Sequence, residues 1–238
     1  MARILIISYE FAPKNNPRAF RWHTLAKEFV QQGHQVDVVT SLAPGLEAYE
    51  EMDEGITAYR PCEGWFGRLR QRISGTHTVV KDGQSSCTSH VTNGVVVKLK
   101  SWLRSLYEMS WKNLYWPDFA CLWINPAKEQ AFKLLKENTY DAMISVSLPF
   151  SGHVVGHAVK KGNPELKWLI DAGDPFCFKQ RIKINNPFIY GRKNIAFEKE
   201  CFDMADVVSV TTEETREEYL KIMGDEYKSK IHVIPPCS

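Results

Sequence analysis

The chain has 238 residues, of which 44% are hydrophobic and 24% charged, and its formal net charge is +2. This length allows one large α/β domain or two small ones, and the composition is ordinary for a globular protein. A net charge this small predicts no nucleic-acid partner. The sequence holds no apolar run near the ~20 residues of a membrane span, and its first apolar stretch is too short for a secretory signal. The six cysteines are scattered, which favours reduced thiols in the cytoplasm over a zinc site or a disulfide scaffold.

The first forty residues have the pattern of a strand–helix–strand unit. Residues 4–7 are a continuous apolar run, typical of a strand buried on both faces. Asn16 and Pro17 then supply an N-cap and the residue favoured at the first helical position. The helix that follows has one apolar face before Gly33 ends it, made by Trp22, Leu25, Ala26, Phe29 and Val30. Residues 36–40 are the second strand, and parallel strands of this kind are joined by a right-handed crossover.

Strands and helices also alternate in the second half of the chain. The apolar spacing predicts helices over 126–137 and 152–161, a helix around 197–205, and another that begins after the N-cap Thr212. Strands are predicted over 141–146, 168–170, 207–210 and 231–234. This alternation predicts the α/β class with a Rossmann-like, doubly wound and mostly parallel sheet.

The stretch from residue 65 to residue 116 interrupts this rhythm. It contains eight basic and two acidic residues, a local net charge of +6, with aromatic residues among them. We expect a polar loop or hairpin over 76–93 and an amphipathic helix over 99–115. Basic and aromatic residues together favour contact with an anionic membrane surface or a lipid-diphosphate acceptor. The alternative is that the helix packs on the sheet as an ordinary core helix.

Four strings, in order, resemble the family 4 retaining glycosyltransferases, which have the GT-B fold of two Rossmann-like domains. They are "RILIISYEFAPKNNPRAFRWHTLAKEFVQQGHQVDVVTS", "YDAMISVSLPFSGHVVGHAVKK", "WLIDAGDPF" and "EKECFDMADVVSVTTEETREEYL…KIHVIPP". The third is similar to the D-x-R-D-P-W of bacterial O-antigen and capsule members. The resemblance covers almost the whole chain except the basic stretch. It implies that residues 1–238 are one acceptor-side domain, with an insertion at about 64–118, and that the donor-binding C-terminal domain is absent from this chain.

The resemblance also implies an activity. The whole enzyme would transfer a sugar from a nucleotide diphosphate donor to an acceptor hydroxyl with retention of configuration, and would need no metal or cofactor. The acceptor expected from the third string is a lipid-linked saccharide of surface polysaccharide synthesis. The protein would then act in the cytoplasm, peripherally at the inner face of the plasma membrane. The 238-residue chain alone is expected to be inactive.

Three basic residues near the first strand are candidates for binding the donor diphosphate. Lys14, Arg18 and Arg21 lie in the loop and first helical turns after this strand, where ligands of open α/β sheets bind and where a helix N-terminus favours anions. The alternatives are solvated loop charges, or a salt bridge from Arg21. The loop over residues 11–18 contains no glycine, whereas many relatives are glycine-rich here.

A second group of candidates begins the helix after the strand over 141–146. Ser151 and Gly152 are expected to bind substrate, and His153 to donate a hydrogen bond to a sugar or phosphate oxygen near the reacting bond. A core or capping role for His153 is the alternative. His157 follows at i, i+4, but no third ligand is apparent in the sequence, so no metal site is predicted.

Two carboxylates follow the strand over 168–170. Asp171 is a catalytic candidate that would bind or polarise the acceptor hydroxyl. Asp174, which precedes Pro175, would bind substrate or fix the turn. Two other functions fit the same scaffold. A nucleotide-sugar 2-epimerase would change the donor without an acceptor, and a non-enzymatic module would bind a saccharide or lipid carrier.

Overall fold

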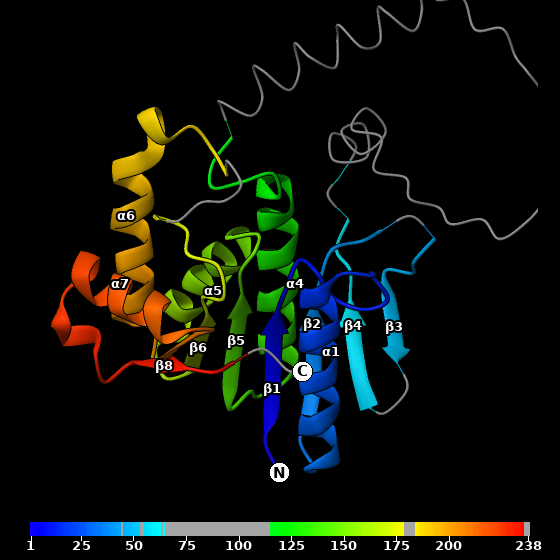
Figure 1. Ribbon diagram of the computed structural model, residues 1–238. Coiled ribbons are helices and arrows are strands. Elements are labelled where there is room, and N and C mark those ends of the chain that lie inside the picture. The colour runs from blue at the N-terminus through cyan, green and yellow to red at the C-terminus, as the bar shows by residue number, and fades with distance from the viewer. Residues whose placement is uncertain (44, 53–54, 63, 65–114, 179–183, 236–238) are drawn as a thin grey trace, which may run out of the picture.

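The computed structural model describes residues 1–43, 45–52, 55–62, 64, 115–178 and 184–235, which form one sheet flanked by helices (Figure 1). The strands are β1 (Arg3–Ile7), β2 (Gln35–Val39), β3 (Tyr49–Met52), β4 (Ile56–Tyr59), β5 (Ala142–Val146), β6 (Lys167–Asp171), β7 (Val207–Val210) and β8 (Ile231–Val233). The helices are α1 (Pro17–Gln31), α4 (Ile124–Glu137), α5 (Ser151–Gly162), α6 (Pro187–Met204) and α7 (Glu213–Met223), with short 3-10 turns η2 (Cys121–Trp123) and η3 (Asp225–Tyr227). The hairpin expected over 76–93, and all but the last residue of the helix expected over 99–115, lie outside the described residues.

The sheet confirms the predicted fold class. Its strand order is β3-β4-β2-β1-β5-β6-β7-β8, and every neighbouring pair is parallel except β3 with β4. The order reverses between β1 and β5, because the chain first builds outward through β2 and β4 and later in the other direction through β6, β7 and β8. The predicted strands and helices in the described part have bounds within two residues of the observed ones, with one exception. Helix α6 begins at Pro187, whereas the sequence predicted a helix only around 197–205.

Helices cover both faces of the sheet, and each face has its own core. In Figure 1, α1 lies in front of the sheet, and α4 and α5 lie behind it. The α1 face buries Ile4, Ile6 and Trp22, whereas the opposite face buries Leu5 and Ile7 of the same strand. Strand β1 is therefore apolar at successive positions because alternate side chains enter different cores. No described helix is both long and apolar enough to cross a membrane.

The helix starts follow the sequence signals. Asn16 accepts a hydrogen bond from the backbone N–H of Ala19, with Pro17 as the first residue of α1. Asn186 and Pro187 repeat this arrangement at α6, where the Asn186 side chain accepts from the N–H of Phe188. These local contacts satisfy N–H groups that would otherwise lack a partner in the first turn.

Strands β3 and β4 were not predicted from the sequence. They form an antiparallel hairpin in which Gly55, at φ 80°, leads into β4. Only Ile56 and Ala58 of β4 are buried, so the apolar pattern is two residues long and too weak to predict a strand. The hairpin is held by Arg60, which is fully buried, donates to the carbonyl oxygens of Glu47 and Ala12, and pairs with Glu50 at 2.6 Å.

Helix α5 approaches the sheet closely at Gly156. A Cβ there would lie 2.9 Å from the ring of Trp168 and 3.0 Å from the Cβ of Ser145. Both distances are shorter than ordinary van der Waals contact, so any larger side chain must push the helix away from β5 and β6.

We therefore expect Gly156→Val to destabilise the fold by about 1–3 kcal/mol relative to Gly191→Val, measured by denaturant unfolding. Gly191 is the matched control, because it also lies inside a helix and a Cβ there would meet no atom within 4 Å. Both variants gain the same helix propensity, so the difference isolates the steric cost. Equal stability of the two variants would contradict the close contact.

Candidate functional site

The predicted site residues lie at the edge of the sheet where β1, β2, β5, β6 and β7 end. Ligands of open α/β sheets bind at this edge, beside the point where the strand order reverses. Here that point lies between β1 and β5. The loops after β1 and β5, over residues 8–16 and 147–150, therefore border the candidate crevice, and the loop after β6 adjoins it.

Arg18, in the first turn of α1, contacts two of these loops. Its Nη1 donates to the carbonyl oxygen of Leu148 at 2.7 Å, and its Nη2 forms an ion pair with Asp174. A guanidinium has five N–H donors, so two contacts leave donors for a ligand. Arg18 is partly exposed and Asp174 about half exposed, so both reach solvent at this edge of the sheet.

Asp171 and Arg21 lie together, but Asp171 is buried. Its Oδ2 accepts a hydrogen bond from the Trp22 indole at 2.8 Å, and its Oδ1 accepts from the Ser209 hydroxyl at 2.8 Å. Arg21 Nη2 is 3.6 Å from Oδ1 and also donates to the carbonyl oxygen of Ile234 at 3.4 Å. Both carboxylate oxygens are thus engaged, and Asp171 fixes α1 and β7 to the end of β6.

His153 is buried, with only one ring nitrogen bonded. Its Nδ1 is 2.8 Å from the Ser145 hydroxyl, which also accepts a hydrogen bond from the Trp168 indole. Its Nε2 has no hydrogen-bond partner within the described protein. Burial, and next the charge of Arg18, lower the pKa of His153 from 6.5 to about 3. The imidazole is therefore neutral at physiological pH and can act through a hydrogen bond but not as a cation.

Ser151 and Gly152 hold the start of α5 in place. The Ser151 hydroxyl donates to Asp118 Oδ1 at 2.7 Å and its backbone N–H donates to Oδ2 at 3.0 Å, so both of these Ser151 groups are already used. A Cβ on Gly152 would lie 2.6 Å from the carbonyl oxygen of Val146. Position 152 therefore requires glycine for the helix to start directly over the end of β5.

Asp118 is a site-forming residue that sequence reasoning missed. It is 1% exposed and also accepts from the backbone N–H of Ala120 at 2.9 Å. Burial raises the pKa of its carboxyl group, whereas the hydrogen bonds from Ser151 and Ala120 act in the opposite direction. The only local signal was the string Trp-Pro-Asp-Phe, because Asp after Pro favours a turn.

Glu198, a buried residue of α6, holds the loop after β6. Its carboxylate accepts from the backbone N–H groups of Phe176 at 3.1 Å and Cys177 at 2.9 Å, and from the Tyr219 hydroxyl at 2.7 Å. Burial raises the pKa of this carboxyl group. The loop that carries Asp174 is therefore attached to α6 and α7.

The contacts of Lys14 differ from those of Arg18 and Arg21. Its Nζ is 2.5 Å from the Ser41 hydroxyl and 3.2 Å from Glu10, and it lies 4.6 Å from the centre of the Tyr9 ring. These partners belong to the β1 and β2 side of the edge. The structure thus groups Arg18, Arg21, Asp171 and Asp174, and places Lys14 beside them rather than among them.

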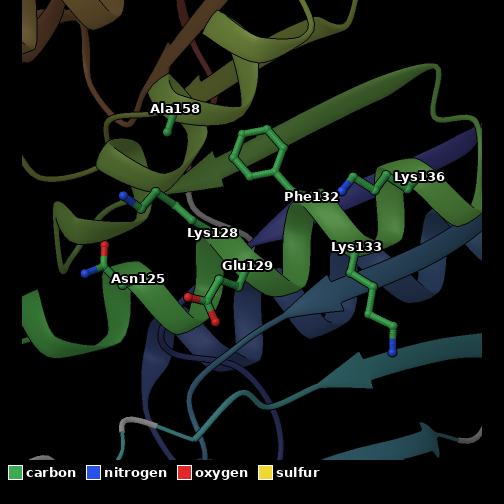
Figure 2. Close-up of a pocket in the computed structure, with 7 residues that line it drawn as sticks. All are labelled: Asn125, Lys128, Glu129, Phe132, Lys133, Lys136 and Ala158. Atoms are coloured by element: carbon green, nitrogen blue, oxygen red, sulfur yellow. The ribbon is translucent and has the colours of Figure 1, made fainter.

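No three metal-binding side chains converge in the part of the chain that the structure describes. His157 instead lies 2.9 Å from Glu200 and packs on the ring of Phe197. A hollow of about 730 Å³ lies elsewhere, along α4 and against Ala158 of α5 (Figure 2). It is lined by Asn125, Lys128, Glu129, Phe132, Lys133, Lys136 and Ala158, and so contains none of the predicted site residues.

Solved structures align with this chain, although no protein-family model and no curated protein matches the sequence. The catalytic domain of starch synthase IV from Arabidopsis thaliana, bound to ADP and acarbose, aligns over 99% of this chain and 51% of its own, with 11% identity and a TM-score of 0.50. An α-glucosyltransferase in complex with UDP and DNA aligns over 99% and 41%, with 11% identity and a TM-score of 0.45. A glycosyltransferase from Rickettsia africae aligns over 98% and 42%, with 12% identity and a TM-score of 0.42.

The comparison with the starch synthase bears on fold and not on activity. The chain has the Rossmann-like architecture of one half of a GT-B glycosyltransferase. It spans about half the length of the starch synthase chain, and less of the other two.

We expect Asp118→Ala to destabilise the fold by about 2–4 kcal/mol, because three donors lose a buried charged acceptor. Ser151→Ala is the matched control. It removes one hydroxyl from the same cluster and leaves the backbone contacts, so it should cost about 0.5–1.5 kcal/mol. Denaturant unfolding measures both variants, and a loss in Asp118→Ala no larger than in Ser151→Ala would contradict the capping role.

We expect neutral His153 to contribute to the unfolding free energy of the wild type, and this contribution to be lost in acid. The group titrates at 6.5 when unfolded and at about 3 when folded, so its contribution is fully present above pH 6.5 and falls as the pH drops toward 3. We expect the unfolding free energy of the wild type to decline relative to that of His153→Gln over this range. Asp118 and Glu198 titrate in both proteins, so their effects cancel in the difference. If the unfolding free energies of the two proteins changed in parallel with pH, the inference that His153 is buried and neutral would be wrong.

Proposed function

We propose that this chain is the acceptor-side half of a retaining glycosyltransferase that moves a sugar from a nucleotide diphosphate to an acceptor hydroxyl. The observation that carries the proposal is the partly exposed Arg18 guanidinium at the reversal point of the sheet, held between Leu148 and Asp174. The fold shared with the ADP-bound starch synthase supports the same class. The reaction would need residues beyond those described here, because GT-B enzymes have two domains.

In this proposal Arg18 binds the donor diphosphate. A guanidinium presents paired N–H groups that match phosphate oxygens, and it stabilises the charge that develops as the leaving phosphate departs. Arg21 adds positive charge close by, with Asp171 as a positioning residue that holds it through the ion pair at 3.6 Å. Lys14 contributes to the positive potential of the same edge.

His153 and Asp174 are the proposed contacts to sugar. The Nε2 of His153 lacks a protein partner, so an oxygen of the bound substrate or of water would satisfy it. The half-exposed Asp174 can accept hydrogen bonds from sugar hydroxyl groups. Ser151 and Gly152 act indirectly, by setting where α5 begins.

The proposed acceptor is a lipid-linked saccharide of surface polysaccharide synthesis, handled at the inner face of the plasma membrane. The support is in the sequence: the "WLIDAGDPF" string, and the net charge of +6 over residues 65–116. Basic residues beside aromatic ones favour an anionic lipid surface or a lipid diphosphate. Residues 65–114 lie outside the described structure.

We expect Arg18→Lys to weaken the binding of UDP or ADP by about tenfold or more, because lysine keeps the charge but loses the paired donors. Isothermal titration calorimetry measures both nucleotides, with Arg216→Lys as the control. Arg216 also bonds a carbonyl oxygen and a carboxylate, but on α7. Unchanged affinity in Arg18→Lys would remove Arg18 from the diphosphate site.

The reaction itself is tested with the natural product of the gene, including any sequence after residue 238. The protein is incubated with a panel of nucleotide sugars and a lipid-linked saccharide fraction, and the product anomer is read by NMR. A retained linkage on the acceptor supports the proposal. Conversion of the donor sugar without acceptor would instead identify a 2-epimerase, and binding without turnover a non-enzymatic module.

A further inference from the structure

The N-terminal half of α6 exposes large apolar side chains. Phe188 is 99% exposed, Ile189 58% and Ile195 42%. At helical spacing these three share one side with Arg192 and Lys193, which are also exposed, whereas Asn194, Phe197 and Glu198 face the protein. Figure 1 shows the first turns of α6 standing beyond the rest of the sheet and its helices. A protruding tip with an exposed Phe–Ile pair is costly in water unless it has a partner.

This tip is basic as well as apolar. Residues 187–197 contain Arg192 and Lys193 and no acidic residue, and the sequence from 175 to 197 has five Lys or Arg and no Asp or Glu. Arg192 and Lys193 therefore lie on the same turns of α6 as the apolar side chains, and those turns carry no carboxylate.

The most basic stretch of the sequence ends against the same helix. Trp116, at the end of the +6 stretch, donates through its indole to Asn194 at 3.0 Å and packs edge-on to Phe197. Lys193 lies over the Trp116 ring, 3.6 Å from its centre. Trp116 and Lys193, which are distant in the sequence, thus meet at α6.

We propose that the N-terminal half of α6 docks on an anionic membrane surface. Phe188 and Ile189 enter the interface between headgroups and acyl chains, and Arg192 and Lys193 contact lipid phosphates. Each basic residue near an anionic leaflet contributes roughly a fivefold factor in binding. An anionic bilayer fits this end of α6 because its headgroups complement the charge of Arg192 and Lys193, while its acyl chains take up Phe188 and Ile189.

The geometry places this contact at the functional edge of the molecule. Helix α6 follows β6, and its N-terminus lies on the side of the sheet where β6 ends, as the candidate site does. A protein docked in this way would hold the crevice near the lipid surface. The inference depends only on the exposed face of α6 and not on the transfer reaction.

The 238-residue chain is mixed with vesicles of phosphatidylcholine, or of phosphatidylcholine with phosphatidylglycerol, and sedimented at low and high salt. We expect the wild type to sediment only with the anionic vesicles, and less at high salt. Phe188→Ser/Ile189→Ser should reduce binding about tenfold or more, because two apolar side chains no longer enter the interface. Arg192→Glu should reduce binding by a similar factor at low salt.

Two controls separate the site from general effects. Phe20→Ser removes a side chain that is 60% exposed on α1, and Lys133→Glu makes the same charge change on α4. Both should bind like the wild type, and all variants should unfold at the wild-type denaturant midpoint.

The proposal is overturned if the wild type does not bind anionic vesicles, or if the α6 variants bind as the wild type does. Equal losses in Lys133→Glu and Arg192→Glu would show that net charge alone decides the binding, and would also overturn it. If Phe188→Ser/Ile189→Ser turns a dimer into a monomer by light scattering and leaves vesicle binding intact, the tip is an interface with a second copy. None of these outcomes depends on nucleotide binding or transfer.

Discussion

The carboxylate of Asp118 is the contact on which the candidate site depends. It binds the backbone and side chain of Ser151, and so supplies from a distant loop the cap that the first residues of α5 do not supply themselves. With the helix start fixed, Gly152 can lie against the end of β5, and His153 is carried into the interior beneath the crevice. The loop before α5, whose Leu148 carbonyl receives Arg18, is positioned by the same contact.

Buried carboxylates recur around this edge. Asp118, Asp171 and Glu198 are each 1–2% exposed, and each accepts two or more hydrogen bonds from other segments of the chain. Burying such a group is expensive unless several donors surround it, and each of these three has them. The buried part of this edge is thus held by hydrogen-bonded carboxylates, while Arg18 and Asp174 are its partly exposed charges.

Features decided by neighbouring residues were predictable from the sequence. The periodicity of β1 and α1, and the caps Asn16 and Thr212, need only a few consecutive residues, and the structure confirms them. The contacts of Ser151 and His153 are different, because their partners come from other elements. Ser151 is 33 residues from Asp118, and a sequence pattern cannot show that its hydroxyl is already bonded.

Dependence on distant partners also explains why the observed role of Asp171 differs from the predicted one. Asp171 was expected to face an acceptor, yet Trp22, 149 residues away, donates to it. Trp22 had been recognised only as a core residue, which it is, but its indole N–H adds a polar contact that periodicity does not report. Type and place of secondary structure were therefore predictable, whereas the bonding state of each polar side chain required the tertiary fold.

The hairpin of β3 and β4 has a consequence for solubility. Among the strands that the structure describes, β3 forms one border of the sheet. An uncovered border strand offers unpaired N–H and C=O groups to any other extended chain. Here that strand has only four residues and carries Glu50 and Glu51 in the middle. The opposite border, β8, is three residues long, with His232 exposed. Short, polar border strands hinder the pairing of one copy with another and so hinder growth into fibrils.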